Sequence, residues 1–164
     1  MYQIGDLVVY GSIGVCRIID ISCPNAGSQK QFYSLAPLYQ SGTIFTPVEP
    51  GKVALRSAMT TEEATALLDQ IPSIHAEIYK ERTLQQLAHK YQRILQSGDA
   101  LQLLTLILSV ARKRRESEAQ GRRLGMLDER FCKQAERLLY GELSVSLDIP
   151  DLPAYVAARI PEAS

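Results

Sequence analysis

The stretch "IGDLVVYGSIGVCRIIDI" (residues 4–21) decides the fold of the first part of the chain. Its apolar residues come in near alternation, which is the period of a half-buried β-strand. Gly11 and Gly14 interrupt this pattern, and glycine adopts the positive φ angles of tight turns without strain. The stretch therefore predicts a strand, a tight turn and a second strand.

The same period of two continues to about Arg56. The segments "QFYSLAPL" (31–38) and "TIFTPV" (43–48) are rich in β-branched and aromatic residues, and "CPNAGSQK" (23–30) has the composition of an exposed loop. These segments predict a small antiparallel β domain. Pro47 cannot donate a hydrogen bond within a ladder, so "TIFTPV" is expected at a sheet edge or a bulge. Such an edge can accept a strand from another protein, although protection of the edge from aggregation is the simpler explanation for Pro47.

After Arg56 the pattern becomes helical. "MTTEEATALLDQI" (59–71) predicts a short helix capped by Thr60 or Thr61. The stretch 73–99 predicts an amphipathic helix that stops at Gly98, and a helix from about Asp99 has a first half that is apolar nearly all round. The stretch 125–153 predicts a further helix that ends before Pro150, with an apolar face made of Phe131, Ala135, Leu138, Leu139 and Leu143. The tail from Pro153 can form a short last helix. The sequence thus predicts an α+β protein with a β domain at 1–57 and an all-α domain at 58–164.

Composition excludes several functional classes. Lys+Arg 18 balances Asp+Glu 18, so any nucleic-acid binding needs a local patch. "GSIG" leads into a strand rather than a helix, which argues against a phosphate loop, and nothing pairs Ser144 with a histidine. We expect no enzymatic activity, no cofactor, no metal and no small-molecule substrate. Three cysteines without C-x-x-C spacing, no secretory signal and no long apolar run favour a cytoplasmic protein that does not bind membranes.

Two basic segments are candidates for phosphate binding. "RKRR" (112–115) is followed at once by "ESE", which favours a solvated helix face with i,i+4 ion pairs over a binding site. The second segment presents hydrogen-bond donors opposite the apolar face of the helix in 73–99. Its members are Arg82, Gln86, His89 and Arg93, joined by Lys90. It is the more coherent candidate, because one helix side presents donors with no acid among them; the expected affinity is modest and salt-dependent.

The opening stretch resembles a known family. Residues 5–18 fit the pattern G-D-x-V-V-Y-x-x-x-G-V-x-x-I of CarD-like (CdnL) bacterial transcription regulators, a module also found in the transcription-repair coupling factor. "YQRILQSGD" (91–99) and the A-x-x-L-L-x-G-E-L stretch (135–143) are similar to the helical half of that family. The resemblance spans residues 2 to 147 in the right order.

The resemblance implies a function with two partners. A small Tudor-like antiparallel β-barrel would dock on the β subunit of RNA polymerase, and the helical domain would contact promoter DNA beside the melted region and stabilise the open complex. Carried onto this chain, the polymerase-binding residues are Ile44, Phe45, Thr46, Pro47 and Val48. The DNA-binding residues are Arg82, Leu84, Gln86, His89, Lys90 and Arg93.

Leu84 is where the chain departs from the family. Several members insert a tryptophan into the minor groove from this position, and this chain has no tryptophan. A leucine can act as an apolar wedge between base steps, but Leu84 shares a helical face with Leu87 and Tyr91, so we expect it in the core. An alternative function is therefore a polymerase-binding adaptor or inhibitor that does not engage DNA and recruits another protein through its helical half.

Overall fold

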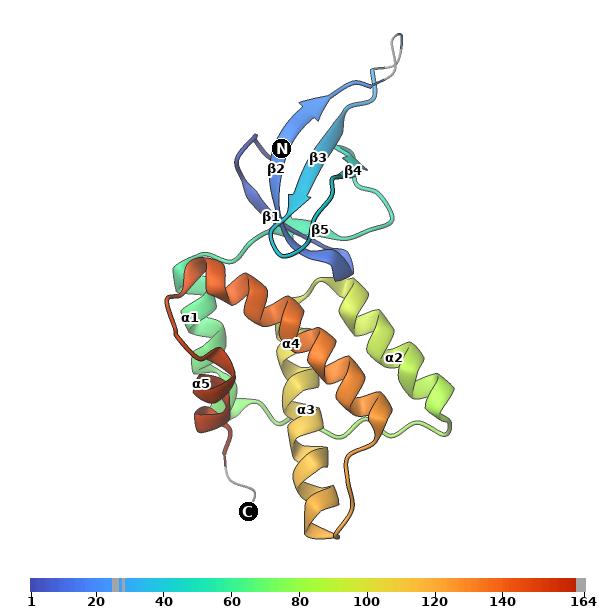
Figure 1. Cartoon of the computed structure of the whole chain (residues 1–164), viewed down its shortest axis with the longest axis vertical. Helices are drawn as coiled ribbons and strands as arrows, with labels where there is room; N and C mark the ends of the chain where they lie inside the picture. The colour runs from blue at the N-terminus through green and yellow to red at the C-terminus, as the bar shows by residue number, and fades with distance from the viewer. Residues whose placement is uncertain (25–26, 28, 162–164) are drawn as a thin grey trace.

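The computed structural model describes residues 1–24, 27 and 29–161. An antiparallel β-sheet comes first and a helical domain follows, so the predicted α+β class is confirmed. The sheet and the helices form two stacked bodies joined by a short connection between β5 and α1 (Figure 1). Among the described residues, no helix is both long and apolar enough to span a membrane.

The sheet contains five antiparallel strands in the order β4-β3-β2-β1-β5. Their bounds are β1 Leu7–Tyr10, β2 Gly14–Ser22, β3 Phe32–Pro37, β4 Ile44–Pro47 and β5 Leu55–Ser57. The strands curl around a small core of buried side chains, which are Val8, Cys16, Ile18, Tyr33 and Leu35. The sheet's edges are β4 and β5, so the prediction that "TIFTPV" forms an edge strand is confirmed.

The predicted tight turn joins β1 to β2. A 3-10 turn, η1 (Gly11–Ile13), connects the strands, and both glycines have positive φ, 44° at Gly11 and 97° at Gly14. A Cβ on Gly14 would lie 3.1 Å from Cδ2 of Leu138, so this turn also packs against the helical domain. Of the loop predicted at 23–30, Asn25, Ala26 and Ser28 lie outside the described residues.

Helix ends follow local capping. The helices are α1 (Thr61–Asp69), η2 (Ile71–Ser73), α2 (Leu84–Ser97), α3 (Ala100–Ala119), α4 (Met126–Ser146) and α5 (Leu152–Arg159). Thr60 caps α1 in a capping box with Glu63, which decides between the two predicted caps. Helix α2 is shorter than the apolar pattern suggested: Thr83 caps it, and residues 74–83 form no α-helix.

Helices α2, α3 and α4 share one core. The first half of α3 is buried nearly all round, and α4 buries its predicted apolar face, which consists of Phe131, Ala135, Leu138, Leu139 and Leu143. One polar contact lies inside this core. The Tyr91 hydroxyl donates to Oδ1 of Asp128 at 2.7 Å, and Nζ of Lys113 lies 2.9 Å from the other carboxylate oxygen. Burial, with the Asp128 contact second, raises the pKa of Tyr91. The three helices are therefore tied by hydrogen bonding as well as packing.

The "RKRR" segment makes contacts within the chain. Nε of Arg112 lies 3.6 Å from a carboxylate oxygen of Glu116, four residues on, and Arg115 donates to the carbonyl oxygen of Pro161 at 2.9 Å. Lys113 forms an ion pair with Asp128. These contacts support the i,i+4-paired helix face over a binding site.

The cysteines provide a test of the fold. Burial raises the pKa of Cys16 to about 11 and that of Cys132 to about 12, whereas Cys23 is exposed. Because the thiolate is the reactive form, Cys16 and Cys132 should stay unmodified at pH 8 while Cys23 reacts. Titration with a chromogenic disulfide should show one rapidly reacting thiol per molecule in the folded protein and three in urea. Fast reaction of all three in the folded protein would contradict this packing.

Candidate functional site

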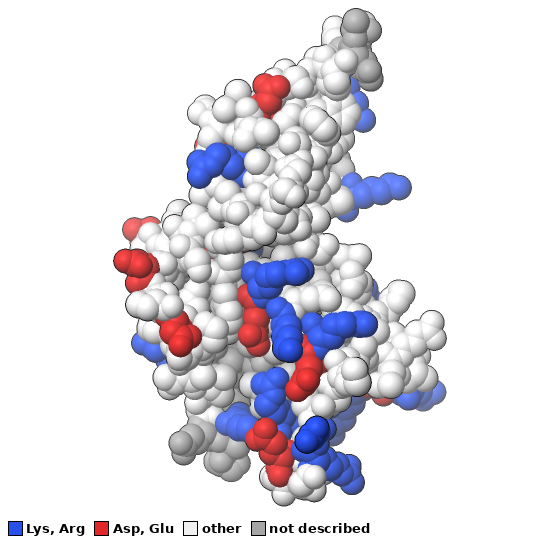
Figure 2. All heavy atoms as spheres, viewed as in Figure 1, with Lys and Arg blue, Asp and Glu red and all other residues white. Residues whose placement is uncertain are grey.

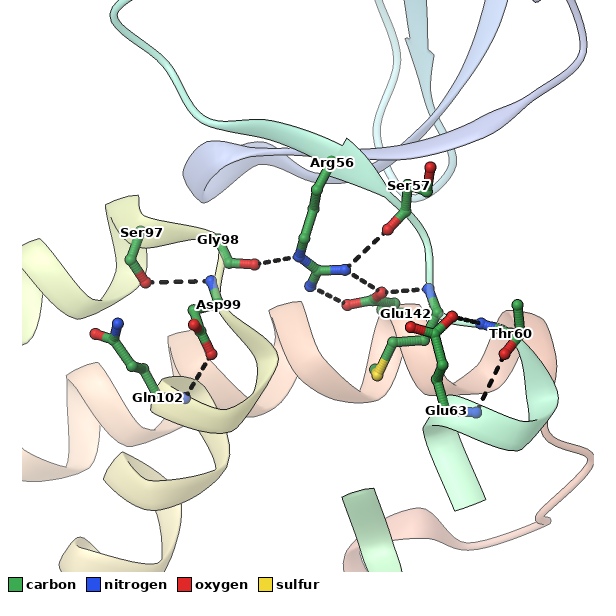
Figure 3. A network of polar contacts seen from close by, with 10 residues as sticks. Arg56, Ser57, Thr60, Glu63, Ser97, Gly98, Asp99, Gln102 and Glu142 are labelled. Atoms are coloured by element: carbon green, nitrogen blue, oxygen red, sulfur yellow. Dashed lines mark hydrogen bonds and ion pairs between the residues drawn. The ribbon is translucent and has the colours of Figure 1, made fainter. Parts of the chain in front are cut away.

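The two domains meet at an ion pair between β5 and α4 (Figure 3). Two guanidinium nitrogens of Arg56 donate to the two carboxylate oxygens of Glu142, at 2.6 and 2.7 Å. The Glu142 side chain is only 2% exposed and that of Arg56 is 31% exposed. This two-pronged geometry fixes the direction of approach as well as the distance, because the planar guanidinium matches the carboxylate edge to edge.

Further hydrogen bonds complete the pair. The backbone N–H of Met59 donates to Oε2 of Glu142 at 2.8 Å, and Nε of Arg56 donates to the carbonyl oxygen of Gly98 at 2.6 Å. A buried carboxylate is tolerated only when such donors replace its water. Arg56 therefore connects β5 to α4 and to the turn between α2 and α3 at the same time.

A second contact lies beside the first. The hydroxyl of Tyr39 donates to the carbonyl oxygen of Gly141 at 2.7 Å. A Cβ on Gly141 would lie 2.9 Å from a ring carbon of Tyr39, so a larger residue there would displace this ring. Gly141 and Glu142 are adjacent in the A-x-x-L-L-x-G-E-L stretch. The structure thus gives this stretch a role in joining the domains.

The open edge of β4 is the predicted polymerase-binding strand. The backbone N–H of Val48 donates to the carbonyl oxygen of Gln31 on the β3 side. Along an antiparallel strand, residues that hydrogen-bond to the neighbouring strand alternate with residues that do not. The backbone groups of Phe45 and Pro47 therefore face away from β3, toward the open edge. Pro47, which has no N–H, removes nothing from the ladder there.

Side chains along β4 differ in what they offer a partner. Phe45 is 67% exposed, whereas Thr46 is buried; Ile44, Pro47 and Val48 are half-buried. Phe45 is thus the apolar side chain of this strand that a partner can cover.

The structure divides the predicted DNA-binding residues into separate groups. Arg82 precedes α2 and shares with Leu84 a groove of about 440 Å³ against α3. A shallow hollow of about 420 Å³ contains the other three outward side chains together with an acid, and its lining includes Gln86, His89, Arg93 and Glu81.

Lys90 pairs with the acid that lines this hollow. Its Nζ lies 3.5 Å from a carboxylate oxygen of Glu81 and 4.7 Å from the centre of the Tyr79 ring. The expectation that these donors have no acid among them is therefore wrong: residues 74–83 form no helix, and Glu81 of this segment lies beside α2.

The expectation that Leu84 packs in the core is also wrong. Leu87 and Tyr91 are buried, but Leu84 is 73% exposed. It is the first residue of α2, so the helix end carries it beyond the core that its neighbours fill. An exposed leucine at a helix tip is free to contact a partner.

Comparison with known proteins assigns the first domain. Residues 2–58 match the family described as CarD-like/TRCF RID domain. The N-terminal domain belongs to this family. The RID domain is an RNA polymerase-interacting module. The match contains all five strands and ends before α1, and no curated protein matches the chain.

The residues that join the RID domain to the helices were missed in the sequence. A signal was present, since Glu142 follows Leu138 and Leu139 at helical spacing on the buried face of α4. An acid on such a face indicates a buried partner. What the sequence lacks is the identity of that partner, because Arg56 lies 86 residues away.

Removal of Arg56 should test the junction. Arg56→Met leaves the Glu142 carboxylate buried without its cation, and should lower the free energy of unfolding by about 3 kcal/mol, the low end for such pairs since Arg56 is partly exposed. Urea denaturation measures the loss. Arg112→Met breaks an exposed pair with Glu116 and a 3.3 Å hydrogen bond to the carbonyl oxygen of Ala76; as the control it should cost less than about 2 kcal/mol. Equal losses in both variants would contradict the special position of Arg56.

Proposed function

We propose that this protein is a bacterial transcription regulator. Its RID domain binds the β subunit of RNA polymerase, and its helical domain contacts promoter DNA and stabilises the open complex. It acts in the cytoplasm by binding alone, with no catalytic step and no cofactor. The RID match at residues 2–58 is the observation that carries the polymerase half of this proposal.

The open β4 edge supports β-strand addition as the mode of polymerase binding. Its outward backbone groups can pair with a strand of the partner, and the exposed ring of Phe45 can fill an apolar pocket there. The five predicted residues then act as one strand in which Phe45 supplies the side-chain contact.

The domain junction supports the DNA half of the proposal. Because Arg56 ties β5 to α4 and to the α2–α3 turn, a docked RID domain holds the helices at a fixed place on the polymerase. Exposed Leu84 with Arg82 beside it suits a wedge at the edge of melted DNA. A protein that binds the open state better than the closed state raises the population of the open state.

A polymerase-binding adaptor is the second candidate function. It is favoured by Glu81, whose carboxylate lies among the donors of α2 and pairs with Lys90. An acid at that place repels phosphate. In this case the helical domain would recruit another protein instead of DNA.

Phe45→Ser tests the polymerase contact. Loss of a central aromatic side chain should weaken binding of the full-length protein to core polymerase by about tenfold or more. Met126→Ser removes an even more exposed apolar side chain from the helical domain and should leave binding unchanged. Biolayer interferometry with immobilised polymerase gives both values. Unchanged binding by Phe45→Ser would argue against docking through β4.

Leu84→Ser tests the DNA contact. Open complexes formed with this variant should decay several-fold faster than with the natural protein, because the apolar contact at the bubble is lost, while polymerase binding stays the same. Leu101→Ser, at another exposed leucine, is the control. Competitor-challenge kinetics on a melted promoter measure the lifetimes. Equal lifetimes for the natural protein and Leu84→Ser would favour the adaptor.

A further inference from the structure

A row of three cations runs along the outer face of α4. Arg130, Lys133 and Arg137 are spaced three and four residues apart, so they lie above one another on one side of the helix. All three are exposed, and the buried face that includes Ala135 is on the opposite side. We call Arg130, Lys133 and Arg137 the α4 basic row.

Intramolecular pairing does not account for this row. The ion pairs between described residues use Arg56, Lys90, Arg112 and Lys113, and none uses a member of the row. The guanidinium of Arg130 lies 4.8 Å from the centre of the Phe131 ring, whereas no such contact is seen for Lys133 or Arg137 among the described residues. Two acids flank it. They are Glu136, whose carboxylate accepts a hydrogen bond from the Cys132 thiol at 3.2 Å, and Glu129, which is exposed.

The row does not stabilise its own helix either. Lys133 and Arg137 are four residues apart, a spacing at which like charges destabilise a helix, and this offsets the attraction of Lys133 to Glu129 four residues before it. The favourable place for cations is the last turn, and α4 has no basic residue there. The three charges of the α4 basic row therefore remain exposed to solvent and accessible to a ligand.

The surroundings of the row favour a polyanion over a protein surface. Figure 2 shows Lys and Arg gathered over α4 and the lower half of α3 with some Asp and Glu between them, whereas Asp and Glu dominate the side of α1. No large apolar side chain is exposed between Arg130 and Arg137. Protein interfaces are centred on apolar or aromatic contacts, and the stretch between Arg130 and Arg137 offers none, although exposed Met126 lies one turn before Arg130.

The row also reaches the RID domain. Arg137 lines a small hollow at the junction together with Ser12, Tyr39 and Gln40, which are uncharged hydrogen-bonding residues. A linear partner lying along α4 can thus continue across the junction without meeting an acid among these residues.

We propose that the α4 basic row binds the phosphate backbone of duplex DNA. The inference rests on the DNA half of the proposed function and moves the main electrostatic contact from α2, where Glu81 intervenes, to α4. Helix geometry places Arg130 and Arg137 about 10 Å apart along the axis. Duplex DNA carries one charge per about 1.7 Å, so one helix face meets several phosphates. The contact is independent of base sequence, since cations on phosphates position a protein without reading bases.

Salt dependence of DNA binding tests this assignment. Full-length protein is titrated into a short fluorescent duplex between about 50 and 200 mM NaCl, and the slope of log K against log salt is measured. The double variant Lys133→Gln/Arg137→Gln should reduce the slope by about 1.8, since each phosphate contact contributes about 0.9. Arg17→Gln/Lys52→Gln loses the same charge from exposed residues of the RID domain and should keep the natural slope.

Other outcomes would overturn the proposal in distinguishable ways. Equal slope changes in both double variants would mean a general charge effect. A reduced slope in Lys90→Gln/Arg93→Gln with a natural slope in Lys133→Gln/Arg137→Gln would return the contact to α2 and leave the proposed function standing. No duplex binding by the natural protein at about 50 mM NaCl would overturn this inference and the DNA half of the proposed function together. Thermal unfolding should show that the α4 variant keeps the natural stability, because the lost repulsion of Lys133 and Arg137 offsets the lost attraction of Lys133 and Glu129.

Discussion

The structure depends on one buried ion pair that joins a sheet edge to a helix. Arg56 reaches from β5 to Glu142 on α4 and to the carbonyl of Gly98, so strands and helices are fixed by the same guanidinium. Without its cation, Glu142 would be a buried charge, which is far more costly than a lost surface contact. The pair therefore selects one relative placement of the two domains, and Tyr39 against Gly141 adds a second constraint to it.

This placement lets the small β domain position the helices. A RID domain alone is a docking module, and its edge strand β4 lies apart from β5, which carries the junction. Polymerase binding at one edge and helix anchoring at the other can thus occur together. The helical domain then presents Leu84 at the tip of α2 and the α4 basic row on its outer face to whatever lies beside the polymerase.

Local rules predicted most of the fold. The alternation in residues 4–21, the glycines of the turn, the edge position of Pro47 and the apolar face of α4 all follow from neighbours in sequence. Contacts across the chain did not follow. Periodicity placed Leu84 in the core because an apolar pattern does not show where a helix starts. In the structure Thr83 caps α2, so Leu84 is the first residue of the helix and lies beyond the core. The position of Glu81 beside the donors of α2 was not predicted either, because the sequence pattern predicted one helix over 73–99 whereas residues 74–83 form no helix.

The central claim is that docking and nucleic-acid contact are made by one rigid unit. The most direct test is a distance measurement between spin labels at Ile19→Cys in the RID domain and Gln92→Cys on α2, both exposed, in a Cys23→Ser background. Pulsed dipolar spectroscopy should give one narrow distance distribution, the same for the free protein and for its complex with core polymerase, and Arg56→Met should broaden it. A broad distribution in the free protein with Arg56 in place would contradict the claim.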